Sequence, residues 1–369
     1  MTDKLRIVIS GGGTGGHIFP AVSIANAIRD KRPDADIRFV GALGRMEMKR
    51  VPAAGYEILG LPICGFDRKN LLKNISVLFK IWKSQRIAKQ FLKEFRPMAA
   101  VGVGGYASGP TLNIAASMGI PCLIQEQNSY AGVTNKLLAK KAERICVAYE
   151  GMERFFPKEK IMLTGNPVRQ SLLDTDISRE DAIRALGFDE SKPLILLVGG
   201  SLGARTINES IMQHLDRIEN SDIQVMLQTG SYYFDDIKKK LSEHKNIPNL
   251  KVVDFISDMG TAYKAADLVV SRAGASSISE FCLIGKPVIL VPSPNVAEDH
   301  QTKNAMALAN NNAALMVKDC CATDKLLDLA FETVRNEDKL AELSSNILKM
   351  ALPNSADIIA DEVIKMATR

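Results

Sequence analysis

The residues best suited to chemistry at the start of the chain are five glycines around Thr14, followed by His17, in LRIVISGGGTGGHIFP at residues 5–20. Glycine adopts positive φ without strain and lets backbone N–H groups come close to a ligand. At the amino end of a helix, such N–H groups attract phosphate. We therefore expect a phosphate-binding loop between a buried strand at residues 5–9 and a helix that opens at about residue 21.

The same glycines allow two other interpretations. The spacing Gly11-x-Gly13-x-x-Gly16 matches the dinucleotide-binding fingerprint, which also needs an acidic residue at the end of the second strand. Here that strand, at residues 37–40, runs into Val-Gly-Ala and carries no acid at its end, which disfavours NAD. The other alternative is a glycine-rich turn that only permits tight packing.

Two more polar segments follow strands of the first half. A strand at residues 99–103 leads into GGYASGP at 104–110, and a strand at residues 122–125 leads into EQNS at 126–129. Ligand sites of parallel sheets lie at the carboxyl ends of the strands, so these segments are expected on one edge. The alternative for residues 126–129 is a helix cap by Asn128 or Ser129.

The second half repeats this plan. After a charged, helical stretch at residues 174–192, where we expect a domain boundary, a buried strand at 194–198 runs into GGSLGAR at 199–205. Further strand-end loops are expected near residues 271–280 and 298–304. The chain is thus predicted to form two similar α/β domains with parallel sheets, each with phosphate-binding loops. Two phosphorylated ligands, one per domain, suit transfer between two diphosphate compounds.

Composition limits the remaining possibilities. A length of 369 residues favours two domains, and 46% hydrophobic with 24% charged residues is typical of a soluble protein. The net charge of +5 gives no reason to expect nucleic acid. We expect no signal peptide and no membrane span, because Met1 leads directly into a charged turn and no apolar run reaches the length needed. Neither a G-x-x-x-x-G-K-[ST] sequence nor a D-x-D motif after a strand is present, so no ATP-type loop, metal or other cofactor is predicted.

Residues 69–93, KNLLKNISVLFKIWKSQRIAKQFLK, combine many apolar side chains with seven basic ones and no acid. One interpretation is an amphipathic helix whose apolar stripe belongs to the core. The other is that the apolar surface around residues 71–82, which includes the only tryptophan, docks on an anionic membrane surface. More residues are apolar than one core-facing stripe needs, so both interpretations stay open.

Taken together, the motifs resemble the MurG family of peptidoglycan glycosyltransferases along nearly the whole chain. The segments that carry the resemblance are GGGTGGHIFPA (11–21), GVGGYASGP (102–110), QEQN (125–128), GNPVR (165–169), GGSLGA (199–204), SRAGASSISE (271–280) and EDHQTKNA (298–305). The resemblance implies a GT-B fold, which has two Rossmann-like domains with parallel sheets facing a central cleft. It also implies an inverting transfer of GlcNAc from UDP-GlcNAc to the C4 hydroxyl of MurNAc in lipid I, giving lipid II, without an essential metal.

The resemblance also implies roles for matching residues. Thr14, Gly15 and Gly16 would approach the donor's sugar–phosphate region and the acceptor diphosphate, and Arg169 and Ser201 would hold the UDP phosphates. Residues 274–277, with Ala275, Ser276 and Ser277, would line the diphosphate as a helix amino end. The remaining substrate contacts would be Asn128 and Gln301 to GlcNAc hydroxyls with Asn304 nearby, the Ile256 backbone to uracil, and Glu280 to the ribose hydroxyls.

An inverting transfer needs a base for the acceptor hydroxyl. His17 is the first candidate, because it ends the first glycine loop and titrates in the useful range. The alternative is that His17 only bonds a phosphate or caps the helix. Glu126 is the second candidate for the base.

Domain roles and partners complete the predictions. We expect an acceptor and membrane-facing domain at residues 1–163, a UDP-GlcNAc-binding domain at 164–350, and a C-terminal helix at 351–369 that packs back on the first domain. The enzyme would sit on the cytoplasmic face of the inner membrane as a peripheral protein, with the cell-wall synthesis machinery as a further partner. The rivals are a UDP-GlcNAc 2-epimerase-like isomerase, a transferase for another lipid acceptor such as a diacylglycerol, and a non-catalytic nucleotide-sugar sensor.

Overall fold

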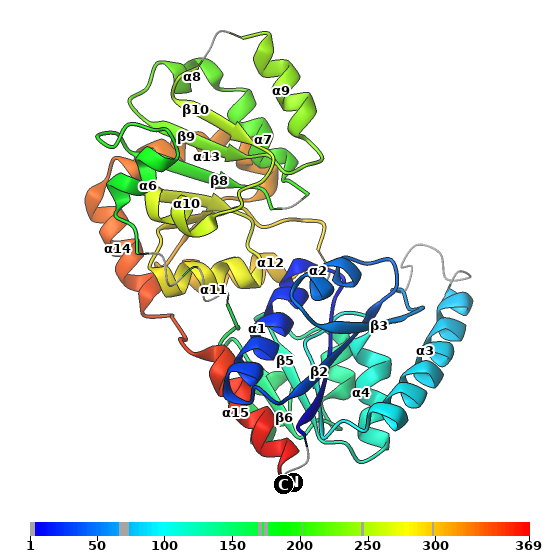
Figure 1. The fold of residues 1–369 in the computed structure, drawn as a ribbon. Helices are drawn as coiled ribbons and strands as arrows, with labels where there is room; N and C mark the ends of the chain where they lie inside the picture. The colour runs from blue at the N-terminus through cyan, green and yellow to red at the C-terminus, as the bar shows by residue number, and fades with distance from the viewer. Residues whose placement is uncertain are drawn as a thin grey trace. The chain divides into compact units, whose positions relative to one another are not determined.

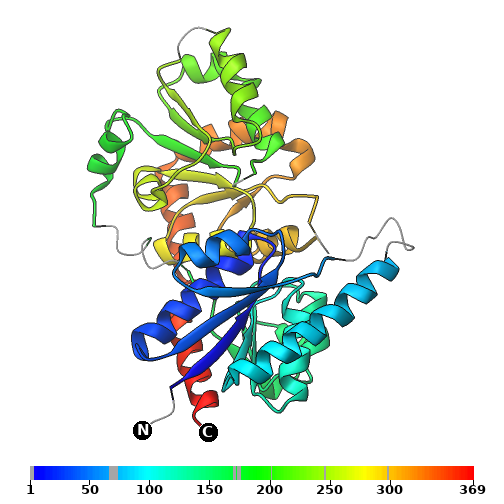
Figure 2. The same cartoon turned by 45° about the vertical axis from the view of Figure 1, so that its right-hand side comes forward.

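The computed structural model describes residues 4–65, 74–168, 172, 176–200, 202–244, 247–296 and 299–369. The chain divides into two compact units, residues 1–169 with 352–369 and residues 170–351. Each unit is built on one parallel sheet with helices on both faces (Figures 1 and 2). The first unit extends to residue 169, beyond the boundary expected at residue 163.

The first unit contains a seven-stranded sheet in the order β3-β2-β1-β4-β5-β6-β7, and all its strand pairs are parallel. Its strands are β1 (Arg6–Ser10), β2 (Asp36–Ala42), β3 (Glu57–Leu61), β4 (Ala99–Gly102), β5 (Cys122–Glu126), β6 (Arg144–Val147) and β7 (Ile161–Leu163). Its α-helices are α1 (Gly15–Lys31), α2 (Glu47–Ala53), α3 (Asn74–Phe95), α4 (Ser108–Ser117), α5 (Val133–Leu138) and α15 (Ser355–Ala367).

The second unit contains a six-stranded parallel sheet in the order β10-β9-β8-β11-β12-β13. Its strands are β8 (Leu194–Val198), β9 (Gln224–Gln228), β10 (Leu250–Val253), β11 (Leu268–Ser271), β12 (Val288–Leu290) and β13 (Leu315–Met316). Its α-helices are α6 (Arg179–Ala185), α7 (Arg205–Met212), α8 (Leu215–Glu219), α9 (Phe234–Ser242), α10 (Met259–Ala265), α11 (Ala275–Ile284), α12 (His300–Ala309), α13 (Ala322–Val334) and α14 (Glu337–Leu348).

The central strands are apolar at almost every position because helices cover both faces of each sheet. In β1, Ile7, Val8 and Ile9 are fully buried, and Ile7 and Val8 belong to clusters on opposite faces of the sheet. Neighbouring residues Ile195 and Leu196 of β8 do the same in the second unit. The α/β class with two parallel sheets, predicted from these runs, is confirmed.

The C-terminal helix α15 belongs to the first unit, where it lies along α1 (red beside blue in Figure 1). Ile359 and Val363 of α15 are fully buried in the cluster that contains Ile24 of α1. On the same helix, the buried Glu362 carboxylate pairs with Arg144 of β6, with 2.9 Å between Oε1 and Nε. Lys31 of α1 also pairs with Asp361 and Asp357 of α15, at 2.8 and 3.8 Å. Apolar packing and several ion pairs therefore fix α15 to this unit.

Two features differ from the sequence-based expectations. The helix expected to open at about residue 21 begins at Gly15, so the last glycines of the loop form its first turn. Strands β3 and β13 were not predicted: β3 has a single fully buried residue and β13 has two residues. In addition, no helix within the described part of the chain is long and apolar enough to cross a membrane.

Candidate active site

In each sheet, the strand order reverses beside the first strand of the unit, between β1 and β4 and between β8 and β11. Ligands of open α/β sheets bind outside the carboxyl ends of the strands at such a reversal. The loops after β1 and β4 contain the glycines at 11–13 and 104–105, and α1 begins at Gly15. In the second unit, residues 199–200 and 202–203 follow β8, and residues 272–274 join β11 to α11. The topology thus brings the predicted loops of each unit to one edge of its sheet.

The two glycine loops of the first unit touch through their backbones. Gly105 has φ +85°, and a Cβ built there would lie 2.4 Å from the carbonyl oxygen of Gly12. A Cβ on Gly104 would lie 2.8 Å from Cδ2 and Nε2 of His17. Glycine is required at both positions because the loop after β4 packs directly on the loop after β1.

The amino end of α1 gathers Thr14, Gly15, Gly16 and His17. Thr14 is the N-cap residue, but its side chain makes no capping hydrogen bond, and the first turn carries no acid. The first N–H groups of a helix have no partner inside it. Those of Gly15 and Gly16 therefore suit an anionic group, as the sequence predicted.

His17 is held against this loop through its Nδ1 atom, which lies 3.0 Å from the carbonyl oxygen of Gly12 and 3.3 Å from Oγ1 of Thr14. A carbonyl oxygen can only accept a hydrogen bond, so Nδ1 carries the proton. In the neutral ring, the basic lone pair is then on Nε2, the atom that faces Gly104. This tautomer is the one that a general base acting through Nε2 requires.

Glu126, at the end of β5, is buried and accepts four N–H donors. Oε1 accepts from the backbone and side chain of Asn128 at 3.1 and 3.3 Å, and Oε2 accepts from Gly132 N and Asn135 Nδ2 at 2.9 and 2.8 Å. Burial raises the pKa of Glu126, although these donors favour its charged form. The carboxylate therefore holds the loop at 128–135, which is a structural task.

The carboxyl end of β5, just before this loop, is tied to Asn166. Asn166 accepts from Gln125 Nε2 at 2.9 Å and donates to the carbonyl oxygen of Gln127 at 3.0 Å. Gln127 in turn donates to the carbonyl oxygen of Val103 at 2.7 Å. This buried network positions Asn128 at the carboxyl end of β5, whereas Arg169 lies outside the described residues.

In the second unit, the amino end of α11 follows β11 directly. Its N-cap residue, Gly274, has no side chain to occupy the helix N–H groups, and its first turn, which contains Ala275, Ser276 and Ser277, has no acid. The buried Oγ of Ser276 makes no hydrogen bond to any residue that the structure describes. These features suit a bound anion such as a diphosphate.

The other predicted donor-site residues lie at the same edge. Glu280 of α11 is buried, with Oε2 3.4 Å from the hydroxyl of Tyr263 on α10, and Ile256 is buried after β10. Gln301 and Asn304 were expected in a loop but belong to α12, where Gln301 Oε1 accepts the N–H of Ser293 at 2.8 Å. Asn304 is fully buried, and Ser201 and Glu298 lie outside the described residues.

Arg272 is a positioning residue that the sequence analysis did not single out. Its guanidinium donates to the carbonyl oxygens of Val291 and Pro292, to Asp319 and to Thr206 Oγ1. One side chain thus ties the segments that follow β11 and β12 to α7. Arg272 could have been identified from its position directly after β11, at the edge where ligands are expected. Nothing in the sequence identified Asp319 as its partner.

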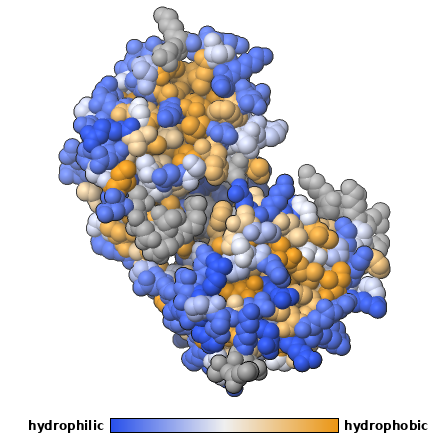
Figure 3. Space-filling model, viewed as in Figure 1, coloured by the Kyte–Doolittle hydropathy of each residue, from blue (hydrophilic) through white to orange (hydrophobic). Residues whose placement is uncertain are grey.

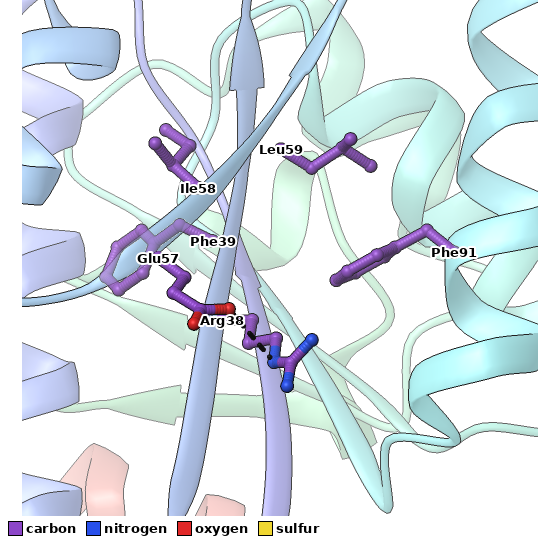
Figure 4. Close-up of a pocket in the computed structure, with 6 residues that line it drawn as sticks. All are labelled: Arg38, Phe39, Glu57, Ile58, Leu59 and Phe91. Carbon is purple, nitrogen blue, oxygen red and sulfur yellow. Dashed lines mark ion pairs between the residues drawn. The ribbon is translucent and has the colours of Figure 1, made fainter.

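A small pocket lies elsewhere, among Arg38, Phe39, Glu57, Ile58, Leu59 and Phe91 (Figure 4). Its volume is about 140 Å³, and apolar residues reach the surface in this part of the unit, around β3 and α3 (Figure 3). Arg38 and Glu57 face each other across it at 3.5 Å. Because these residues lie in the first half of β2 and β3 and on α3, the pocket is separate from the edge that carries the glycine loops.

Comparisons with known proteins agree with this geometry. The family model described as "Glycosyltransferase family 28 N-terminal domain" matches residues 7–147, and that described as "Glycosyltransferase family 28 C-terminal domain" matches residues 194–359. The chain belongs to glycosyltransferase family 28. A relative from Phocaeicola vulgatus, 66% identical over 100% of this chain and 98% of its own length, is named UDP-N-acetylglucosamine--N-acetylmuramyl-(pentapeptide) pyrophosphoryl-undecaprenol N-acetylglucosamine transferase.

Solved structures agree as well. The crystal structure of Acinetobacter baumannii MurG has a TM-score of 0.78 and 29% identity, over 98% of this chain and 99% of its own. A Neisseria meningitidis UDP-GlcNAc 2-epimerase, at 12% identity with a TM-score of 0.67 over 98% and 99% of the two chains, shares the fold alone. The resemblance to the MurG family, the GT-B fold and the assignment as a glycosyltransferase are therefore confirmed.

Proposed function

We propose that this glycosyltransferase moves GlcNAc from UDP-GlcNAc to the C4 hydroxyl of MurNAc in lipid I, forming lipid II with inversion at the sugar. The observation that carries the proposal is the 66% identity, over the full chain, to a relative named as that transferase. The two anion-binding edges add physical support, because the reaction joins a nucleoside diphosphate sugar to an acceptor that carries a diphosphate.

Most of the proposed donor contacts come from the second unit, the UDP-GlcNAc-binding domain that the sequence predicted at residues 164–350, whereas Arg169 and Asn128 belong to the first unit. The N–H groups at the amino end of α11 hold the diphosphate together with Arg169 and Ser201, and the buried Glu280 accepts the two ribose hydroxyls. The Ile256 backbone meets uracil, and Asn128, Gln301 and Asn304 approach GlcNAc. Backbone N–H groups aimed at the diphosphate stabilise the negative charge that develops on UDP as it leaves.

The acceptor is bound by the first unit, the domain that the sequence predicted at residues 1–163. Its diphosphate lies at Thr14, Gly15 and Gly16, which also approach the sugar–phosphate region of the donor. His17 Nε2 takes the proton of the C4 hydroxyl while that oxygen forms the new bond to C1 of GlcNAc and the bond from C1 to the diphosphate breaks. The geometry favours His17 over Glu126, because both Glu126 oxygens already accept N–H donors.

We also propose that the first unit binds the membrane through α3. On α3, Val77, Ala88 and Leu92 are buried against the unit, whereas Leu78, Phe79 and Trp82 are 60%, 64% and 53% exposed. Lysines 80 and 83 are exposed beside them. Large exposed apolar side chains with basic neighbours suit the anionic cytoplasmic face of a membrane, where lipid I would be reached; residues 71–73 of the predicted surface lie outside the described part.

The deciding experiment is transfer of labelled GlcNAc from UDP-GlcNAc to a lipid I analogue, with product identified by mass spectrometry. We expect one GlcNAc to be added, and only with the lipid-linked acceptor. Formation of UDP-ManNAc when the protein is incubated with UDP-GlcNAc alone would instead indicate an epimerase. Transfer of GlcNAc to a diacylglycerol would indicate a transferase for a different lipid acceptor. His17→Ala should lower kcat far more than it weakens UDP binding, and near-normal turnover would remove His17 as the base.

Membrane binding has its own test, flotation with vesicles that contain anionic lipid. Phe79→Ser with Trp82→Ser should lose binding, whereas Tyr232→Ser, which alters a 76% exposed side chain of the second unit, should not. Equal flotation of the two proteins would reject the surface on α3.

A further inference from the structure

One buried carboxylate has no place in the mechanism above. Glu47, the first residue of α2, is 1% exposed, and no cationic side chain of the described residues pairs with it. Its Oε1 accepts the backbone N–H of Ala42 at 3.0 Å, and its Oε2 accepts that of Gly13 at 2.8 Å. A buried, unpaired carboxylate is costly unless its hydrogen bonds do something that an apolar residue cannot.

Two glycines make room for this carboxylate. A Cβ on Gly12 would lie 2.2 Å from Cδ of Glu47, and a Cβ on Gly41 would lie 2.6 Å from its Cγ. The first glycine loop and the end of β2 are therefore shaped around Glu47. One of the loop N–H groups that the sequence assigned to phosphate, that of Gly13, is already bonded inside the protein.

The N–H that Glu47 accepts and the carbonyl that His17 contacts belong to one peptide group, the one that joins Gly12 to Gly13. In a trans peptide, these two groups point in opposite directions, so the carboxylate and the imidazole flank the same peptide plane. An N–H bonded to a carboxylate polarises its peptide, and the carbonyl becomes a stronger acceptor. Nδ1 of His17 donates to that carbonyl at 3.0 Å.

We propose that Glu47 is a positioning residue that acts on His17 through the Gly12–Gly13 peptide. The carboxylate fixes the peptide, and the peptide holds the proton of His17 on Nδ1, so that Nε2 is the basic atom. The arrangement serves the purpose of the aspartate beside a catalytic histidine, with a peptide group inserted between carboxylate and ring. The inference rests on the proposed function in so far as His17 is the base.

The test is Glu47→Gln, which keeps the side chain's size but lets only one of its two terminal atoms accept. Either Gly13 or Ala42 then loses its acceptor. We expect kcat to fall about 10- to 100-fold, the range typical when a hydrogen-bonding partner that orients a metal-ligating histidine is removed. The affinity for UDP should change less than about twofold, because Glu280 and the amino end of α11, which are proposed to bind UDP, belong to the second unit. The matched control is Glu57→Gln, because the Glu57 side chain is 78% exposed.

A spectroscopic readout separates this role from simple loss of structure. The ¹⁵N resonances of His17, identified by their absence in His17→Ala, report which ring nitrogen carries the proton. We expect an Nδ1-protonated neutral ring in the unaltered protein and a shift toward the Nε2-protonated form in Glu47→Gln. An Nε2-protonated ring in the unaltered protein would overturn the proposal even if Glu47→Gln did not fold. A fall in kcat with an unchanged tautomer would also overturn it.

The outcome is distinguishable from failure of the proposed function. Absence of transfer to lipid I, or full activity of His17→Ala, would reject the substrate or the base while the tautomer remained as described. Activity lost in His17→Ala but unchanged in Glu47→Gln would reject the role of Glu47 alone.

Discussion

The contact between the two glycine loops of the first unit makes Gly105→Ala the most informative stability variant. Gly105 has φ +85°, where an L-residue costs about 1–2 kcal/mol. Its new Cβ would also lie 2.4 Å from the carbonyl oxygen of Gly12 and 3.0 Å from Gly12 N. These are backbone atoms that no rotamer change can move, so the loop must shift by about 1 Å, and overpacking of this kind costs about 1–3 kcal/mol.

Gly13→Ala is the matched control because Gly13 has φ +89° and a Cβ there meets nothing within 4 Å. Both variants place alanine at a positive φ, and both change the entropy of the unfolded chain in the same way. The difference between their free energies of unfolding therefore measures the contact between Gly105 and Gly12. We expect Gly13→Ala to lower the free energy of unfolding of the first unit by about 1–2 kcal/mol. Gly105→Ala should lower it by about 2–5 kcal/mol, the sum of the two costs.

The assay is urea unfolding followed by the fluorescence of Trp82, the only tryptophan, which lies in the first unit. This probe matters because a chain of two units need not unfold in one step. Gly105→Ala should also reduce kcat, since Gly12 supplies the acceptor for His17. Equal stability of the two variants would refute the argument, because the loops would then not be in contact at Gly105.

Three further predictions follow from the packing. Arg272→Lys should raise the KM for UDP-GlcNAc severalfold in transfer assays and leave the stability of the first unit unchanged, because lysine cannot serve all four acceptors of the guanidinium; an unchanged KM would refute that role. Burial raises the pKa of Glu362, but the Arg144 hydrogen bond and the Lys365 charge outweigh it and lower the pKa overall. The ionised Glu362 therefore stabilises the fold above the unfolded pKa of about 4.3, and this stabilisation is lost as pH falls through the lower folded pKa. Glu362→Gln should lower the free energy of unfolding by about 1–3 kcal/mol at neutral pH, and by progressively less as the pH falls below about 4.3. Burial raises the pKa of Cys122, Cys146 and Cys282 to about 12, so mass spectrometry should find iodoacetamide on the exposed Cys320 well before these three, and equal labelling would contradict their burial.

The sequence predicted those parts of the site that depend on local patterns. A run of apolar β-branched residues that ends in glycines marks a buried strand and its loop, so the loops after β1, β4 and β8 could be located from the residues alone. It missed the start of α1 at Gly15, because glycine has a low helix propensity and the local sequence gave no reason to extend the helix through Gly15 and Gly16. It missed β3 because the apolar residues of this edge strand form a short run that Gly60 interrupts.

What sequence patterns could not supply are the partners that hold the loops in place. Glu47 lies 34 residues from Gly13, and Asp319 lies 47 residues from Arg272, so only the pairing of strands brings them together. Sequence analysis predicted that the N–H groups of the first glycine loop bind phosphate. For Gly15 and Gly16 this stays a prediction. The N–H of Gly13 is not available for phosphate, because a carboxylate of the protein already accepts it. A glycine-rich turn at a strand end therefore predicts where donors gather, while the residues packed behind it decide which of them can reach a ligand.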